Sequence, residues 1–231
     1  MMNETVKLLP WLTARGKMHG YVQTFVRNGG RVLECSADTL VMVQEEADMV
    51  FALGQFRDTE EILKAGTLMT DRKDWFEEKL AGGQYAGTLI ARNAVYMKDL
   101  PPEEIILPGT SFRMLDEKDL PFVQETYTGF DADDAYLKRC LRRGMIGIEA
   151  EGQLAGYIGT HDEGAMGLLQ ILPQYRRRHY AEALETAMIR FLMADGRAVW
   201  GQVEESNTAS RRLQEKLGFA WGDLYYWLFR E

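Results

Sequence analysis

The chain is poor in cysteine, proline and histidine, and its acidic residues outnumber its basic ones. Its 231 residues include two cysteines, six prolines and three histidines. Cys35 and Cys140 are too few, and too far apart in sequence, to form a disulfide framework or a zinc site. We therefore expect reduced thiols, as in a cytoplasmic protein, and no metal site.

Long apolar runs are also missing. No apolar stretch reaches membrane-spanning length, and the apolar segment within MMNETVKLLPWLTARGK, at the start, is too short between its charges to be a signal peptide. We therefore expect a soluble, unprocessed protein that does not associate with a membrane.

The composition is that of a folded, acidic protein. Hydrophobic residues make up 46% of the chain and aromatic residues 11%, which is enough for a core in one large domain or two small ones. The net charge of −8 argues against nucleic acid as a partner, because a phosphate backbone repels such a surface. An anionic ligand would need a local basic site.

The first half alternates predicted helices and strands. Residues 17–27 place apolar side chains at helical spacing and are followed by NGG, which predicts a helix. RVLECSADTLVMVQ predicts two strands and DMVFAL a third. Asp58 and Glu61 have the spacing of a capping box before a short helix. DRKDWFEEKL predicts a further helix, and TLIARNAVYM predicts the last strand of this half.

A stretch with three prolines, DLPPEEIILPG, is the candidate linker between domains of residues 1–107 and 108–231. The second half predicts strands in SFRML, MIGIEA, QLAGYIGT, AMGLLQIL, AVWGQV and WGDLYYWLF, and helices over residues 119–127, 131–143 with Asp131 as N-cap, 180–194 and 208–217. Both halves contain a helix, three strands and a helix in the same order. This order suggests a duplication, although a single α+β sheet would also fit.

One basic site occurs where a strand is predicted to turn into a helix, in LQILPQYRRRHYAEAL at residues 169–184. Such a turn directs its backbone N–H groups, and those of the first helical turn, toward one point that attracts phosphate. Arg176, Arg177 and Arg178 would add charge and forked donors. An isolated run of three arginines in a loop is more simply read as solvated, but its place between strand and helix favours an anion site.

Two motifs in this half resemble those of the GNAT superfamily of acyl-CoA-dependent N-acyltransferases. PQYRRRHYA occupies the place of the family's pyrophosphate-binding turn, [QR]-x-x-G-x-[GA], between its fourth strand and third helix. NTASRRLQEKLGF, at residues 207–219, is similar to a second family motif, N-x-x-[AS]-x-x-L-Y-E-K-L-G-F. The resemblance covers residues 111–231, and both motifs occur in the family's order and at its typical spacing.

The resemblance implies a GNAT fold of the α/β (α+β) class, in which helices flank a mixed central sheet, with residues 108–231 as the acyltransferase domain. The first half has a similar layout, but its strand-to-helix turn, in ALGQFRDTEEIL, lacks the ligand motif. Residues 1–107 therefore look like a degenerate GNAT-like domain, as in the tandem arrangement of glycine N-acyltransferase-like proteins.

The resemblance also implies a cofactor, acetyl-CoA or coenzyme A, and roles for single residues. The backbone of Leu169, Gln170 and Ile171 would pair with the pantetheine arm, and the N–H of Leu169 would polarise the thioester carbonyl. Asn207 would contact the pantetheine and cap the next helix. The remaining cofactor contacts would come from Arg176, Arg177, Arg178, His179, Ala181, Glu182 and Ser210.

Three residues depart from the family pattern. His179 stands where glycine is usual, so the turn must accept a side chain and a different backbone angle. Glu182 puts a carboxylate near the expected pyrophosphate, where complementing the helix dipole is its simpler role. Gln214 replaces the tyrosine that commonly protonates the departing thiolate, and an amide cannot act as an acid. Tyr225, Tyr226 or water would then have to supply that proton.

Acyl transfer to an amine also needs a neutral nucleophile, and an amine is mostly charged at neutral pH. A carboxylate or histidine at the strand ends, acting through water, would help. His161, Asp162, Glu163 and Glu204 are candidates by position, although a solvated turn or strand end explains each of them as well.

Two functions fit these patterns. The first is an N-acetyltransferase that moves an acetyl or other acyl group from acyl-CoA to a primary amine of a small molecule or amino acid. The second is a catalytically weak GNAT-fold module that binds acyl-CoA, as the departures at His179 and Gln214 suggest. A plain binder of nucleotide phosphates would leave the second motif unexplained. Thioester turnover with a panel of amines separates the first two.

Overall fold

The computed structural model describes residues 3–129 and 132–230. The chain forms two compact units. Unit 1 comprises Met1–Met97 together with Gln202–Glu231, and unit 2 comprises Lys98–Gly201. The C-terminal segment therefore belongs to the unit that holds most of the first half. The predicted division into two duplicated domains, residues 1–107 and 108–231, stays a prediction.

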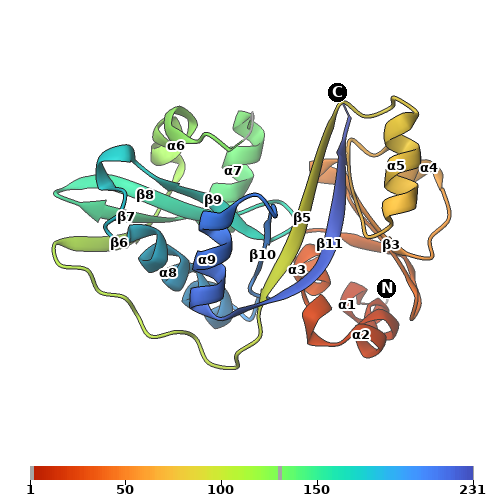
Figure 1. Cartoon of the computed structure of the whole chain (residues 1–231), viewed down its shortest axis with the longest axis horizontal. Helices are drawn as coiled ribbons and strands as arrows, with labels where there is room; N and C mark the ends of the chain where they lie inside the picture. The colour runs from red at the N-terminus through yellow and green to blue at the C-terminus, as the bar shows by residue number, and fades with distance from the viewer. Residues whose placement is uncertain (1–2, 130–131, 231) are drawn as a thin grey trace. The chain divides into compact units, whose positions relative to one another are not determined.

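Unit 1 is a mixed sheet with helices on both faces (Figure 1). Its strand order is β1-β2-β3-β4-β11-β5, and all neighbours are antiparallel except β3 and β4. The strands are β1 (Arg31–Cys35), β2 (Thr39–Gln44), β3 (Met49–Gly54), β4 (Thr67–Thr70), β5 (Gly87–Tyr96) and β11 (Phe219–Phe229). The helices are α1 (Glu4–Lys7), α2 (Leu9–Arg15), α3 (Tyr21–Arg27), α4 (Glu60–Lys64), α5 (Lys73–Ala81) and α9 (Thr208–Leu217).

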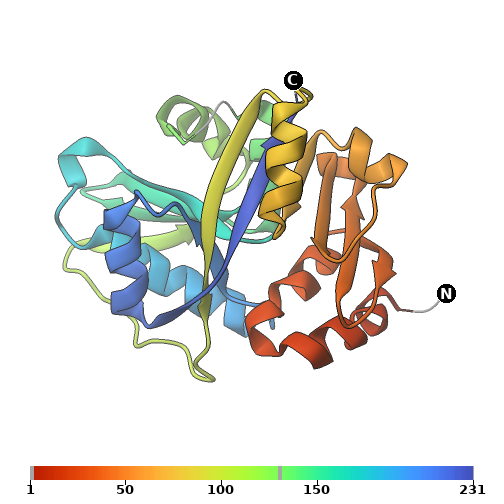
Figure 2. The same cartoon turned by 45° about the vertical axis from the view of Figure 1, so that its right-hand side comes forward.

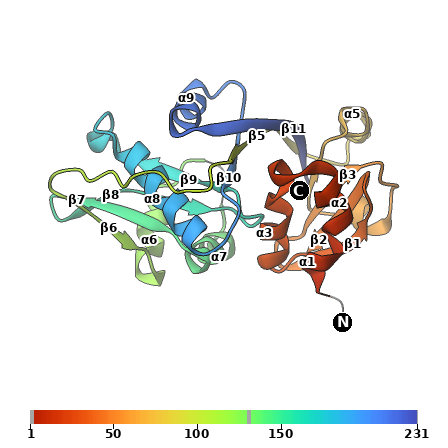
Figure 3. The same ribbon diagram turned by 90° about the horizontal axis from the view of Figure 1, so that it is seen from below.

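Aromatic side chains join these helices to the sheet. On one face Phe25 of α3 packs on Phe51 of β3, with ring centroids 4.3 Å apart, and Figure 3 shows α1, α2 and α3 gathered beside strands β1 to β3. On the other face Phe76 of α5 packs on Tyr226 of β11 at 5.0 Å. Figure 2 shows the gold helix α5 against the long, adjacent strands β5 and β11. Strand β11, from the end of the chain, thus completes the core of unit 1.

The strands of unit 2 follow the order β6-β7-β8-β9-β10, in which only the neighbours β9 and β10 are parallel. Helices α6 and α7 pack on one face through a buried cluster that includes Val123, Leu137 and Tyr157, and α8 covers the other face (Figure 1). The strands are β6 (Thr110–Met114), β7 (Ile146–Ala150), β8 (Gln153–Thr160), β9 (Met166–Ile171) and β10 (Trp200–Val203), which leads into unit 1. The helices are α6 (Leu120–Thr126), α7 (Asp134–Arg143) and α8 (Tyr180–Ala194).

The structure corrects several local predictions. The helix expected over 17–27 is divided at Gly20 into a short 3-10 turn and α3. Asp58 does not cap α4; Thr59 does, because its hydroxyl accepts the N–H of Ile62. Asp131 lies outside the described residues, and α7 instead begins behind Asp133, whose carboxylate accepts the N–H of Tyr136 at 2.7 Å.

Other predictions hold. Residues 97–109 contain neither helix nor strand, as expected of the linker segment. Asn207 caps α9, and Gly218 takes the left-handed angle expected after that helix, with φ of 89°. Within the described residues, no helix combines the length and the apolar character needed to cross a membrane.

Candidate active site

Strand β9, which precedes the arginine-rich turn, carries a bulge. Leu168 has a left-handed φ of 51°, and the register with β8 shifts between the pairs Tyr157–Gln170 and Gly159–Gly167. One residue of β8 therefore faces two residues of β9. A left-handed angle is rare for a bulky side chain, so the surrounding packing must hold it there.

Beyond the bulge, β9 is not paired with β10 in the part of the chain that the structure describes. Its parallel neighbour β10 is in register with it at a single position, Met166 with Gly201. The backbone groups of Leu169, Gln170 and Ile171 on that side are thus outside the β9–β10 ladder. An extended ligand with amide groups can pair with such an edge as another strand would. These three residues are the ones predicted to contact a pantetheine arm.

The turn after β9 has an unusual backbone. Arg177 and His179 are both left-handed, with φ of 61° and 63°. The turn is anchored by Tyr175 and Tyr180, which are buried and stack with ring centroids 6.1 Å apart. His179 stands where the family usually has glycine, and the backbone at this position is left-handed here. His179 therefore adopts an angle that suits glycine, despite its side chain.

Helix α8 begins without a side-chain cap. His179 is its N-cap residue and makes no capping hydrogen bond, and the first helical bond runs from the N–H of Ala183 to the carbonyl of His179, at 3.1 Å. The N–H groups of Tyr180, Ala181 and Glu182 come before this first helical bond, so the carbonyls four residues before them lie outside the helix. A long helix that starts in this way offers N–H donors and the positive end of its dipole to an anion.

The three arginines have different surroundings. Arg176 donates from Nε to the carbonyl of Ile171 at 3.1 Å, which ties the turn to the end of β9. Arg178 lies over the ring of Tyr175 and is 3.7 Å from Glu151, in an exposed pair that contributes little. Arg177 is exposed, and no partner for it is seen within residues 3–129 and 132–230. Among the three arginines, Arg177 is thus the one whose side chain makes no hydrogen bond or ion pair with the described residues.

Glu182 lies next to His179. Its carboxylate lies 3.3 Å from Nδ1 of His179, one helical turn away, and it is the acidic residue of the first turn of α8. This position matches the predicted role of complementing the helix dipole. Its closeness to an expected pyrophosphate stays a prediction.

The turn between β8 and β9 brings several ionisable groups together. Asp162 is buried and binds two arginines of α7, Arg139 through both carboxylate oxygens at 2.8 and 2.9 Å and Arg143 at 2.7 Å. Its role is therefore structural. His161 accepts or donates a hydrogen bond at Nδ1, 2.5 Å from the hydroxyl of Tyr136 on α7.

Two neighbours in this turn have pKa values shifted in opposite directions. Glu163 is 6% exposed, and burial raises the pKa of its carboxyl from 4.5 to about 8, with the charge of Asp162 adding to the rise. Burial lowers the pKa of the His161 imidazole to about 4, and the charge of Arg143 acts in the same direction. Paired groups whose pKa values are pushed apart are typical of acid–base sites.

The other predicted site residues lie in unit 1. Glu204 and Asn207 are exposed and Ser210 is half-buried; the side chain of Asn207 accepts the N–H of Ser210 at 3.1 Å. Tyr225 is 1% exposed, and its hydroxyl bonds with that of Tyr21 at 2.7 Å. Burial raises the pKa of Tyr225, which makes it a poor acid.

Sequence reasoning missed Tyr136, Arg139 and Gly167 as parts of this region. Tyr136 and Arg139 were recognisable only as residues of an amphipathic helix, since their partners lie more than twenty residues away in sequence. Gly167 is required because a methyl group there would come within 2.0 Å of Nε2 of His161. No sequence signal of a single chain reveals such a contact.

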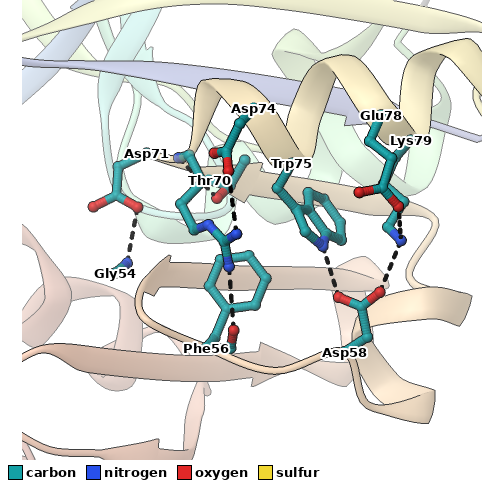
Figure 4. Close-up of polar contacts among 10 residues, drawn as sticks. Gly54, Phe56, Asp58, Thr70, Asp71, Asp74, Trp75, Glu78 and Lys79 are labelled. Carbon is teal, nitrogen blue, oxygen red and sulfur yellow. Dashed lines mark hydrogen bonds and ion pairs between the residues drawn. The ribbon is translucent and has the colours of Figure 1, made fainter.

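The corresponding turn of the first half is closed by its own side chains (Figure 4). Asp71 accepts the N–H of Gly54 at 2.8 Å, and Arg72 donates to the carbonyl of Phe56 at 3.3 Å. Asp58 accepts from Trp75 at 2.6 Å and pairs with Lys79 at 2.8 Å. Strands β3 and β4 are also paired at four positions, unlike β9 and β10. The carboxylates of Asp58 and Asp71 thus lie at this turn, where an anion site would need hydrogen-bond donors.

The comparisons agree with the resemblance seen in the sequence. Residues 144–228 match the family described as FR47-like protein. A Drosophila protein of known structure aligns with a TM-score of 0.77 at 14% identity, over 98% of this chain and 95% of its own. A GCN5-related N-acetyltransferase-like protein from Streptococcus suis aligns with a TM-score of 0.61 at 11% identity, over 99% of this chain and 100% of its own. A GCN5-related N-acetyltransferase from Kribbella flavida aligns with a TM-score of 0.54 at 14% identity, over 94% of this chain and 95% of its own.

No curated protein sequence matches the chain. At these identities the solved structures establish the fold and not the activity. The predicted fold is confirmed: the chain has the GNAT fold, with a mixed sheet flanked by helices, and residues 144–228 match the FR47-like family.

Proposed function

We propose that the chain is an acyl-CoA-dependent N-acyltransferase that moves an acetyl or other acyl group to a primary amine of a small molecule or amino acid. One arrangement carries this proposal. Strand β9 is bulged, is not paired with β10 beyond the bulge within the described residues, and leads through two left-handed residues, Arg177 and His179, to the uncapped start of α8. The FR47-like match spans the same residues and supports it.

The residues of this arrangement fit acyl-CoA. The edge at Leu169, Gln170 and Ile171 would bind an extended arm with amide groups, and the backbone from Arg176 to Ala181 would bind a diphosphate. When bound, acyl-CoA would supply the activated thioester carbonyl. The N–H of Leu169, next to the bulge, is the donor proposed to polarise that carbonyl. Asn207 and Ser210 are proposed on the sequence motif alone.

Glu163 suits the role of the base that prepares the acceptor. An amine reaches the protein mostly as an ammonium ion, and only the ionised form of Glu163 can take its proton. With a pKa near 8, that form is the minority at neutral pH, but it is a stronger base than an ordinary carboxylate and becomes the major form above pH 8. The surplus of acidic residues in the chain would also favour a cationic acceptor. Glu204, exposed and in unit 1, is a second proposed base supported only by its position.

One observation favours the second candidate, a weakly catalytic acyl-CoA-binding module. Gln214 is buried in α9 where the family's acid usually stands, and Tyr225, its proposed substitute, is buried with a raised pKa. Neither residue is suited to protonate a thiolate. The two candidates differ in turnover rather than in binding.

The test is a thermal-shift and calorimetric titration with CoA and acetyl-CoA, followed by thiol release from acetyl-CoA with a panel of primary amines and amino acids. A ligand that binds only the folded chain raises its melting temperature by mass action. Binding with amine-dependent thiol release supports the enzyme. Binding without it supports the module, and the absence of any shift at saturating CoA overturns the cofactor assignment.

A further inference from the structure

The proposed position of the acyl-CoA arm fixes the direction in which its acyl chain would extend. The diphosphate is proposed to bind at the turn after β9 and the thioester carbonyl at the N–H of Leu169, so the arm runs back along β9. An acyl chain that continues in this direction reaches the bulge at Leu168 and then Gly167. Beyond that point the edge of the strand is occupied, because Met166 is in register with Gly201 of β10. The acyl chain would therefore turn toward one face of β9.

The two faces of β9 differ at this point. Side chains alternate between the faces of a strand, so the positions of Met166 and Gly167 belong to opposite faces. Met166 is buried, whereas Gly167 is half-buried and has no side chain of its own. The face of Gly167 is the one toward α7, because the ring next to it, that of His161, hydrogen-bonds with Tyr136 of α7. The acyl chain would thus turn toward Gly167 and α7.

The space beside Gly167 is filled by the ring of His161. A methyl group added to Gly167 would lie 2.0 Å from Nε2, 2.5 Å from Cδ2 and 3.1 Å from Cε1, and the first two distances are too short for non-bonded atoms. Gly167 does not have a left-handed φ, so the ring, and not the backbone angle, excludes a side chain here. The ring therefore occupies the place that the carbons of a longer acyl chain would need.

Several contacts hold the ring in this place. The hydroxyl of Tyr136 lies 2.5 Å from Nδ1 of His161, and the centroids of the two rings are 6.3 Å apart. The N–H of His161 donates to the carbonyl of Ala165 at 2.9 Å, which closes the turn between β8 and β9. The next residue, Asp162, is bound by two arginines of α7. The ring is thus a fixed steric barrier beside β9.

This steric barrier is uncharged at neutral pH. Burial lowers the pKa of the His161 imidazole to about 4, and the charge of Arg143 acts in the same direction. An apolar group can therefore pack against the ring without removing water from a charge, which would be costly. The methyl group of an acetyl thioester is such a group.

We propose that His161 is a specificity-determining residue whose ring limits the length of the acyl group, so that the donor is acetyl-CoA and longer acyl-CoA thioesters are excluded. This inference rests on the proposed acyltransferase function, and it narrows the acyl donor of that reaction. The role depends on the volume of the ring, whatever hydrogen bonds its two nitrogens make. A smaller side chain in place of His161 would leave room for further carbons beside Gly167.

The kinetic test compares acetyl-CoA with butyryl-CoA, whose acyl chain is longer, using the most active amine of the panel. We expect kcat/KM of the wild-type chain to be lower for butyryl-CoA by about 10-fold or more, as for a methylene group that a site does not admit. His161→Ala should bring the two donors to within about twofold of each other. His161→Phe is the matched control, because it keeps a ring in this place and should keep the preference for acetyl-CoA.

A binding measurement does not depend on turnover. Calorimetric titration gives the Kd of CoA, acetyl-CoA and butyryl-CoA for each variant. We expect the wild-type chain to bind butyryl-CoA about 10-fold or more weakly than acetyl-CoA, and His161→Ala to bind both alike. CoA has no acyl group, so its Kd should not depend on this residue. An equal change in all three Kd values would overturn the inference, because the ring would then support the whole site.

A second substitution tests the place itself. In the double variant His161→Ala, Gly167→Leu, the new side chain on β9 enters the space that the ring has left, and no left-handed angle opposes it. We expect the preference for acetyl-CoA to return, because the lost volume is replaced from the other side. A general loss of packing would not be repaired in this way. Urea unfolding shows whether each variant is folded.

The outcomes separate this inference from the proposed function. If the wild-type chain uses butyryl-CoA as well as acetyl-CoA, or if folded His161→Ala keeps the preference, the steric barrier is wrong and the acyltransferase stands. Equal broadening in His161→Phe also overturns it, since ring volume is then not the cause. If the chain binds acyl-CoA but releases no thiol, the titrations alone decide. If it neither binds CoA nor releases thiol with any amine, the proposed function fails and this inference fails with it.

Discussion

At the scale of single residues, the turn after β9 depends on angles that side chains other than glycine rarely adopt. Arg177 and His179 hold φ of 61° and 63°. A non-glycine residue in this region costs about 1–2 kcal/mol. Sequence comparison with the family predicted that His179 would have to accept such a position. It could not predict Arg177, because the family pattern is a motif of residue types and carries no angle.

We predict that His179→Gly and Arg177→Gly bind CoA as well as or better than wild type, and unfold with an equal free energy or one higher by about 1 kcal/mol. Arg177→Ala keeps the strained angle and removes one exposed charge, so it should weaken CoA only modestly. His179→Pro should abolish binding, since proline cannot take a positive φ and lacks the N–H. Calorimetric titration and urea unfolding measure both quantities. Loss of binding in Arg177→Gly or Arg177→Ala, with His179→Pro unaffected, would instead indicate a side-chain cluster.

Glu163 gives a prediction about pH. The folded chain keeps the proton of this carboxyl up to about pH 8, whereas the unfolded chain releases it near 4.5. The free energy of unfolding therefore falls between these values as pH rises, by up to about 1.4 kcal/mol per pH unit. Glu163→Gln removes this loss, so its stability relative to wild type should rise from pH 5 to pH 8. Urea unfolding at several pH values checks this, and a constant difference would show that Glu163 ionises normally.

At the scale of helices and strands, two features decided what could be predicted from the sequence: the repeat of apolar residues and the residues that flank each element. Helices α8 and α9 match their predicted ranges because each has a long apolar repeat and a clear end. Strand β4 was missed, since Thr67–Thr70 is too short to show alternation. The capping of α4 was misjudged because Asp58 is drawn away by Trp75 and Lys79, and no local pattern shows these partners.

The prediction at this scale concerns the self-closed turn of the first half. Asp71→Ala removes the acceptor of the Gly54 N–H and should lower the free energy of unfolding by about 1–3 kcal/mol, as for a hydrogen bond to a charged group. The Kd of CoA should stay within about twofold, because this turn has no proposed ligand. Urea unfolding and calorimetry test the two parts separately. A large loss of CoA affinity in a folded Asp71→Ala chain would place part of the cofactor site in the first half.

For the molecule as a whole, the sequence indicated two similar halves, but it could not show that the C-terminal strand pairs within the unit of the first half. Strand β11 lies between β4 and β5, and its aromatic sequence would suit any buried strand. The choice of partners depends on long-range register, which a single sequence does not encode locally. A truncation to residues 108–231 would therefore leave β11 without its neighbours, and point variants are the sounder test.

Leu228 of β11 and Leu184 of α8 form a matched pair for this test, since both are fully buried, one in each unit. Leu228 lies opposite Leu68 of β4 and Thr88 of β5. Replacing either leucine by alanine should cost about 2–5 kcal/mol. If β11 completes the core of unit 1, Leu228→Ala should speed amide hydrogen exchange mainly in β3, β4 and β5, more than a hundred residues earlier in the chain. Leu184→Ala should do so mainly in β7, β8 and β9. Faster exchange in β7 to β9 with Leu228→Ala, and none in β3 to β5, would mean that the C-terminal strand completes the sheet of the second half instead.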